Sequence, residues 1–182
     1  MKTKEDDIEI SWIEASKRDK RHFAPLYERY YEMIFRFVFK RVQDMDVTGD
    51  LVSGVFMKAM VNINQYTHQG YPFSSWLFRI ALNETNMWFR AQKKRVEVPL
   101  SQETAASLLD EFQETRNDAD LERMVEAMNE LKEEQVLLIE LRFFENHSFQ
   151  EIGNIFDVAE NTAKMRVYRA LEALRNSMER GK

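Results

Sequence analysis

The chain has 182 residues, of which 44% are hydrophobic, and this is enough for one or two small domains with packed cores. It contains no cysteine, which excludes disulfides and thiolate metal sites, and its three prolines and five glycines are too few for the many turns of an all-β fold. An evenly spread net charge of −5 would argue against binding to nucleic acid. However, residues 100–134 alone hold eleven acids and three bases, so the rest of the chain has a net charge of +3.

The first predicted module covers residues 8–95 and is helical. A short helix is expected at residues 8–17, and Pro25 suits the first turn of a second helix, where its missing amide would have no partner. Apolar residues then recur with helical spacing as far as Val42, and the same spacing predicts a third helix over residues 50–63. These helices supply the core of one small domain.

Residues 34–42 form the most apolar run of the chain, and three basic residues interrupt it. The run is too short and too charged to span a membrane, and residues 1–7 lack the apolar stretch of a signal peptide. We therefore expect a cytoplasmic protein that does not insert into a membrane.

A short polar and aromatic loop, residues 64–72, precedes a fourth helix that Ser74 or Ser75 is expected to cap. Proteins hold unpaired bases by stacking them on aromatic rings beside basic side chains. The loop, the helix and the basic cluster that follows supply both kinds of group. The candidates are Tyr66, His68, Tyr71, Arg79, Asn83, Arg90, Lys93, Lys94 and Arg95.

Simpler roles compete with this interpretation. For Tyr66 and Tyr71, stacking on bases and anchoring of the loop explain the pattern equally well. Trp76 and Trp88 are expected to pack between helices, and the basic cluster at residues 90–95 is expected to contact phosphates rather than to be only a solvated helix face.

Residues 96–118 lose the helical periodicity and carry mostly acidic charge, so they are expected to form a flexible linker. A second helical module is predicted over residues 119–180. The sequence thus favours an all-α protein of two small helical domains joined by an acidic linker, and the C-terminal domain has four helices that include a helix-turn-helix.

The helix-turn-helix pattern lies in residues 148–178. Ser148 and Glu151 have the spacing of a capping box, and residues 157–159 suit the tight connection. In the second helix an apolar stripe recurs at three- and four-residue steps and is expected to be buried; it comprises Ala163, Val167, Ala170, Leu171, Leu174 and Met178. The other side is free to enter a major groove, and its candidates are Asn161, Thr162, Lys164, Met165, Arg166, Tyr168 and Arg169, with Arg166 expected on a phosphate.

Three segments, in this order, resemble parts of the extracytoplasmic-function (ECF) sigma factors, which belong to the sigma-70 superfamily of bacterial RNA polymerase subunits. They resemble the clamp-binding helix, the promoter-melting helix and the upstream-element reader of that family. The segments are Asp50-Leu51-Val52 with Val55-Phe56, then residues 73–83 ending in Arg90 and the basic cluster, then residues 148–152 with residues 161–170.

The resemblance covers nearly the whole chain and implies a sigma factor. Such a protein binds the clamp and flap of the polymerase core, reads an upstream element of duplex promoter DNA with residues 119–180, and captures the melted downstream strand with residues 8–95. It implies Asp50, Ser53, Met57 and Lys58 as polymerase-binding residues and no cofactor. It also allows a further partner, either an anti-sigma factor or another DNA-bound targeting protein.

The chain departs from the family pattern at several positions. Ser53 and Gly54 stand where the family usually has a glutamine and an acid, and a glycine inside a helix costs about 1 kcal/mol relative to alanine. Met165 replaces a small polar residue on the reading side, which implies a different upstream preference. Asp157 stands where a glycine is common, and aspartate tolerates a left-handed turn better than most residues.

Two other classes of protein compete with the sigma factor. An enzyme is not expected, because the chain has no phosphate loop or hydrolase motif and its three histidines lie far apart. A helix-turn-helix regulator that never enters polymerase is the main alternative, but it has no need for the first module. A helical adaptor that binds only proteins would lack the steep salt dependence of DNA binding, and for residues 148–178 alone an ordinary helical hairpin remains an alternative.

Overall fold

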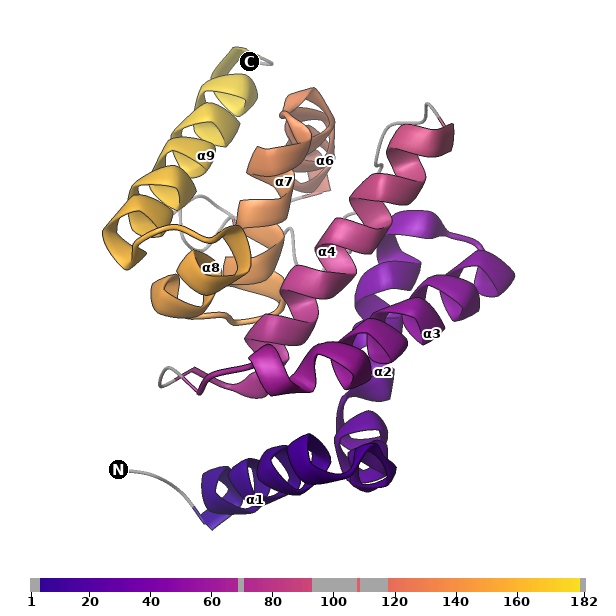
Figure 1. The fold of residues 1–182 in the computed structure, drawn as a ribbon. Helices are drawn as coiled ribbons and strands as arrows, with labels where there is room; N and C mark the ends of the chain where they lie inside the picture. Colours follow the sequence, from indigo (N-terminus) through magenta and orange to yellow (C-terminus); the bar gives the residue numbers. More distant parts are fainter. Residues whose placement is uncertain (1–3, 69–70, 93–107, 109–117, 181–182) are drawn as a thin grey trace. The chain divides into compact units, whose positions relative to one another are not determined.

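The computed structural model describes residues 4–68, 71–92, 108 and 118–180, and every regular element in these ranges is a helix (Figure 1). Contacts divide the chain into two compact units, residues 1–94 and 95–182. The predicted all-α fold with two helical domains is confirmed. Within the described ranges no helix is both long and apolar enough to cross a membrane.

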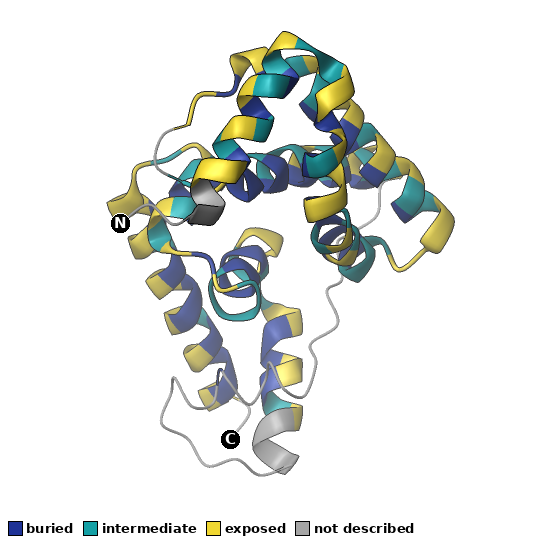
Figure 2. Ribbon diagram, turned by 90° about the horizontal axis from the view of Figure 1, so that it is seen from below, coloured by how far each residue is buried: buried dark blue, intermediate teal, exposed yellow. Residues whose placement is uncertain are grey.

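In the first unit three long helices pack on one another and a fourth joins them at one end. The elements are α1 (Lys4–Arg18), the short 3-10 helix η1 (Lys20–Phe23), α2 (Ala24–Val42), α3 (Met45–Asn62), the 3-10 helix η2 (Ile63–Gln65) and α4 (Phe73–Gln92). Helices α2, α3 and α4 contact one another, and α1 packs against η1 and α2. Their buried residues line one side of each helix (Figure 2), and the core includes Leu26, Ile34, Phe37, Val52, Val55, Phe73, Leu77 and Phe78.

Two helix starts in this unit differ from the prediction. Helix α3 begins at Met45, because the Asp44 carboxylate accepts a hydrogen bond of 3.0 Å from the amide of Val47. Helix α4 begins at Phe73, so the expected cap at Ser74 or Ser75 is wrong, and both serines are buried. By contrast, Pro25 lies in the first turn of α2 as predicted.

In the second unit the other helices pack around the long helix α9. The elements are α6 (Asp118–Glu130), α7 (Glu133–Ile139), the π-helical turn η3 (Glu140–Phe144), α8 (Phe149–Phe156) and α9 (Glu160–Arg180). Helix α9 packs against α6, α7 and α8, and its whole predicted apolar stripe is buried. In the predicted linker, residues 96–107 and 109–117 lie outside the described residues, and Leu108 is fully buried.

The helix-turn-helix has the predicted caps. The Ser148 hydroxyl accepts a hydrogen bond from the Glu151 amide at 3.2 Å, and the Ser148 amide donates to the Glu151 carboxylate at 2.6 Å. Asp157 ends α8 in the left-handed region, with φ 55° and ψ 46°. Both local predictions are confirmed, so the start of α8 and the turn into α9 are each specified by their own sequence.

Candidate nucleic-acid and polymerase interfaces

The first half of α9 carries most of the side chains that the sequence predicts to read an upstream element. Opposite the buried stripe, Met165 and Tyr168 are 53% and 47% exposed. The exposed residues on this side, which we call the reading face, are Asn161, Thr162, Lys164, Met165, Tyr168 and Arg169. They form one accessible surface of a rigidly packed helix, as a major-groove reader requires; their contact with DNA stays a prediction.

Arg166 differs from its neighbours on α9. It lies at the border between the reading face and the buried stripe, and its Nη1 is 3.0 Å from Oε1 of Glu134 in the first turn of α7. The guanidinium therefore already has an anionic partner within the unit. Without DNA the pair joins α9 to α7, and contact of Arg166 with a phosphate stays a prediction.

An aromatic and cationic cluster borders the reading face, and the sequence analysis missed it. The ring of Phe149, in the first turn of α8, lies 5.9 Å from the ring of Tyr168. The guanidinium of Arg142 lies 4.6 Å from the centroid of the Phe149 ring, and Nζ of Lys164 lies 6.0 Å from both ring centroids. These cation–π contacts orient the Lys164 side chain along α9. The only sequence signal was an aromatic residue directly after the capping serine.

The predicted downstream residues lie before and along α4. His68 and Asn83 are exposed and Tyr71 is half-buried, and we call these three the strand-capture residues. Asn83 follows Phe73 by ten residues, so it lies about 15 Å further along α4. Arg90 is exposed and Arg79 is half-buried. The remaining predicted residues, Lys93, Lys94 and Arg95, lie outside the described residues.

Tyr66 is buried, and only 6% of it is exposed. Its ring packs edge-on against Phe73, with centroids 5.1 Å apart, and lies 5.2 Å from the ring of Trp76. Burial, followed by the charge of Glu9, raises the pKa of the Tyr66 hydroxyl. Of the two interpretations of this residue, loop anchoring fits the structure, and base stacking by Tyr66 is the wrong one. Trp76 packs here as predicted.

The outward side of α3 carries the four residues predicted to bind polymerase. Asp50, Ser53, Met57 and Lys58 are all exposed, and Met57 is 59% exposed. Val61, one turn beyond Met57 and 61% exposed, extends this surface, and the sequence analysis missed it. Lys58 is engaged within the unit, because its Nζ lies 2.5 Å from Oε1 of Glu84 on α4. We call Asp50, Ser53, Met57 and Val61 the α3 face.

Comparisons with known proteins agree with this arrangement. Family models for sigma-70 region 2 and sigma-70 region 4 match residues 26–95 and 127–176. The chain is 31% identical over 141 residues to the RNA polymerase sigma factor SigV of Bacillus subtilis, covering 78% of this chain and 81% of SigV. It is 30% identical over 159 residues to the ECF sigma factor BldN of Streptomyces coelicolor, covering 84% of this chain and 58% of BldN.

The chain belongs to the ECF family of sigma-70 factors. Two solved structures share the fold of this ECF sigma factor. CnrH, in complex with the cytosolic domain of CnrY, has a TM-score of 0.63 and 19% identity, covering 96% of this chain and 99% of CnrH. RpoE of Bartonella quintana, in complex with the anti-sigma factor NepR, has a TM-score of 0.57 and 21% identity, covering 86% and 96%.

The two family regions contain most of the predicted surfaces of the sigma factor. Region 2 spans α2, α3 and α4, and thus the α3 face and the strand-capture residues. Region 4 begins within α6, ends within α9 and includes the reading face. Helix α1 precedes the region 2 match, so its contribution has to be judged from its contacts.

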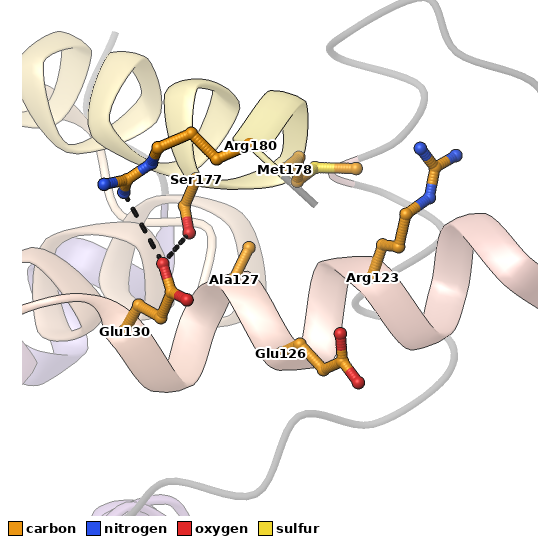
Figure 3. A pocket seen from close by; sticks show the side chains of 7 residues that line it. All are labelled: Arg123, Glu126, Ala127, Glu130, Ser177, Met178 and Arg180. Atoms are coloured by element: carbon orange, nitrogen blue, oxygen red, sulfur yellow. Dashed lines mark hydrogen bonds and ion pairs between the residues drawn. The ribbon is translucent and has the colours of Figure 1, made fainter. Parts of the chain in front are cut away.

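A pocket of about 180 Å³ lies between α6 and α9 (Figure 3). Glu130 closes one side, where its carboxylate accepts a hydrogen bond from the Ser177 hydroxyl and lies 3.5 Å from Nη2 of Arg180. These residues lie near the C-terminal end of α9, far from the reading face at its start. The pocket thus belongs to the packing of the second unit rather than to its reading face.

Gly54, the departure on α3, leaves room for a side chain. A Cβ atom there would meet nothing closer than Oε2 of Glu84, at 3.9 Å, which is an ordinary contact. Gly54→Ala is therefore expected to stabilise the first unit by about 1 kcal/mol, because alanine loses less backbone entropy in a helix. Chemical unfolding followed by tryptophan fluorescence checks this, since all three tryptophans lie in this unit. A loss of stability would mean that α3 needs a glycine here.

Glu151 makes the second unit sensitive to acid. Burial opposes ionisation of this carboxyl, but hydrogen bonds from His147 and from Ser148 outweigh burial and lower the pKa to about 2 from its ordinary 4.5. The unfolded chain thus takes up this proton at a higher pH than the folded chain does. The resulting stability is complete above pH 4.5 and is lost as the pH falls to about 2, with an upper bound of roughly 3 kcal/mol.

Hydrogen exchange of the α8 and α9 amides across this pH range checks the effect. Glu151→Gln should flatten the acid dependence of their protection while leaving that of α2 and α4 unchanged. An unchanged acid profile in the variant would show that another group controls it.

Proposed function

We propose that this ECF sigma factor binds RNA polymerase core, carries it to promoters with its reading face and helps to open them with its strand-capture residues. The observation that carries the proposal is the reading face itself, six outward side chains on a helix whose opposite side is fully packed. Folding requires only the packed side, so the composition of the other side is free to serve recognition. The proposed role includes no catalysis and is exercised in the cytoplasm, where polymerase and DNA meet.

For the core contact we propose the α3 face, directed at the polymerase clamp, with a second contact to the flap from the second unit. Met57 and Val61 place apolar area on an exposed helix side, and Asp50 adds a charge at its edge. Apolar groups that are costly to expose commonly mark protein-binding surfaces. Lys58, paired with Glu84, is proposed to support this face rather than to reach the clamp.

For promoter opening we propose that Tyr71 stacks on an unpaired base while His68 and Asn83 hold the displaced strand. Stacking on one aromatic ring returns about 1–3 kcal/mol, which offsets much of the cost of unstacking a base. Tyr66 serves as the anchor beneath them. Lys93, Lys94 and Arg95 are proposed to contact the backbone phosphates.

We propose a three-part organisation, with residues 8–95 and 119–180 as domains and residues 96–118 as the linker between them. In that linker, Leu108 is packed against the protein. Because the solved relative RpoE is bound to the anti-sigma factor NepR, we propose an anti-sigma factor as a further partner, and a DNA-bound targeting partner is a second candidate.

Co-purification with core polymerase tests the core contact. Met57→Asp should weaken the complex without unfolding the chain, because it places a charge in the centre of the α3 face. Met87→Asp is the matched control, since Met87 is 58% exposed on α4, outside this face. Equal loss of binding in both variants would show that the contact covers a broader surface than α3. Unchanged binding in both would show that the α3 face does not bind polymerase.

A further inference from the structure

A buried carboxylate, Glu9 of α1, connects three helices of the first unit. Glu9 is 7% exposed. Its Oε1 accepts a hydrogen bond of 3.1 Å from the amide of Phe73, the first residue of α4. Its Oε2 accepts a hydrogen bond from the Tyr30 hydroxyl of α2 and lies 3.9 Å from Nε of Arg29.

The contact with Phe73 caps the first amide of α4 from a distant part of the chain. The first amides of a helix have no partner within the helix, and a side chain just before them usually accepts their hydrogen bonds. At α4 the acceptor comes from a residue 64 positions earlier in the chain. A negative charge at this end of a helix is also favourable. Glu9 therefore fixes where α4 begins, relative to α1 and α2.

The same contact point lies beside the segment that carries two of the strand-capture residues, His68 and Tyr71. The ring of Phe73 lies 5.1 Å from Tyr66 and 5.8 Å from Tyr30, so the residues just before and just after the chain segment that carries His68 and Tyr71 meet beside Glu9. Neither His68 nor Tyr71 is buried. Their positions depend on the two anchored ends, and one of those ends is held by Glu9.

We propose that Glu9 is a positioning residue for promoter opening, which holds the start of α4 so that His68 and Tyr71 are presented in the geometry that captures an unpaired strand. This inference rests on the proposed function of the strand-capture residues. Pre-ordering these side chains lowers the entropy lost when a flexible strand binds. Helix α1, which lies outside the region 2 match, thereby contributes to the opening step without touching DNA.

The test uses the full chain in complex with core polymerase. Glu9→Ala removes both acceptors, Glu9→Gln keeps an oxygen for the Phe73 amide, and Tyr30→Phe removes only the hydroxyl. Glu14→Ala is the matched control, because Glu14 lies on the exposed side of α1 and pairs only with Lys17 among the ion pairs described. Permanganate reactivity of unpaired thymines is measured on a duplex promoter and on the same promoter with a pre-melted bubble.

Glu9→Ala is expected to reduce opening of the duplex promoter about tenfold, the equivalent of one hydrogen bond to a charged group. Opening should recover on the bubble, core binding should be unchanged, and Glu9→Gln should restore most of the loss. Tyr30→Phe should have a smaller effect, and Glu14→Ala none.

Three outcomes would overturn the positioning role of Glu9 or the proposed function on which it rests. If His68→Ala and Tyr71→Ala impair opening but Glu9→Ala and Glu9→Gln do not, the positioning role is wrong while the proposed function stands. If His68→Ala and Tyr71→Ala open the promoter normally, the proposed function of these residues fails first. If Glu9→Ala loses core binding as well, and Glu9→Gln does not restore opening, Glu9 serves only the stability of the fold.

Discussion

Replacing Gly153 with alanine should destabilise the second unit by about 1–3 kcal/mol, the usual cost of forcing an extra carbon into a packed site. A Cβ atom at this position would lie 2.7 Å from the carbonyl oxygen of Val158, and this neighbour is backbone that cannot rotate away. Because this contact lies in the turn between α8 and α9, the substitution should also displace the reading face and abolish upstream-element binding. Chemical unfolding and DNA binding of the same variant check both effects.

The matched control is Gly54→Ala, the same substitution in the other unit with the opposite expected sign. If Gly153→Ala is as stable as the unsubstituted chain, the close approach of the turn to α8 is relaxed in solution. Loss of DNA binding without loss of stability would place the effect in the orientation of α9 alone.

The second large effect concerns the reading face. Lys164→Ala and Arg169→Ala should each weaken binding to the upstream element by about 1–3 kcal/mol and relax the preference at one base pair. Both residues are exposed, and the rings of Phe149 and Tyr168 orient the Lys164 side chain. Binding to a panel of single-base variants of the element, at fixed salt, measures the change in preference.

Two control variants lie on the same helix. Arg175→Ala removes an equal charge three turns beyond Lys164 and should leave the base preference intact. Arg166→Ala breaks the pair with Glu134 and should weaken all sequences alike. If Lys164→Ala and Arg169→Ala also act uniformly across the panel, α9 positions the protein, and the specificity lies elsewhere.

The sequence predicted those features that depend on residues close together in the chain. The buried stripe of α9, the capping box of Ser148 and Glu151 and the left-handed Asp157 all follow from spacings of a few residues. The start of α3 was missed even though its signal, Asp44 before Val47, is just as local. The apolar spacing begins only at Leu51, whereas the cap sets the start of the helix at Met45.

The remaining features depend on distant partners that periodicity does not reveal. Tyr66 looked like an exposed loop aromatic, and only the folded unit places it against Phe73 and Trp76. Arg166 pairs with Glu134, which lies 32 residues earlier in the chain, and the carboxylate that caps α4 belongs to Glu9. The spacing of a helix identifies which side chains point outward, but not which of them find a partner on the next helix.

Specific initiation in a purified system distinguishes a sigma factor from a regulator that only binds DNA. The chain is mixed with core polymerase and double-stranded fragments of the source genome, and the transcripts are mapped to their first nucleotide. We expect discrete start sites that core polymerase alone does not use, and we expect Met57→Asp and Gly153→Ala to lose them. Specific DNA binding by the chain without any new start site would overturn the proposed function and favour a helix-turn-helix regulator that does not enter polymerase.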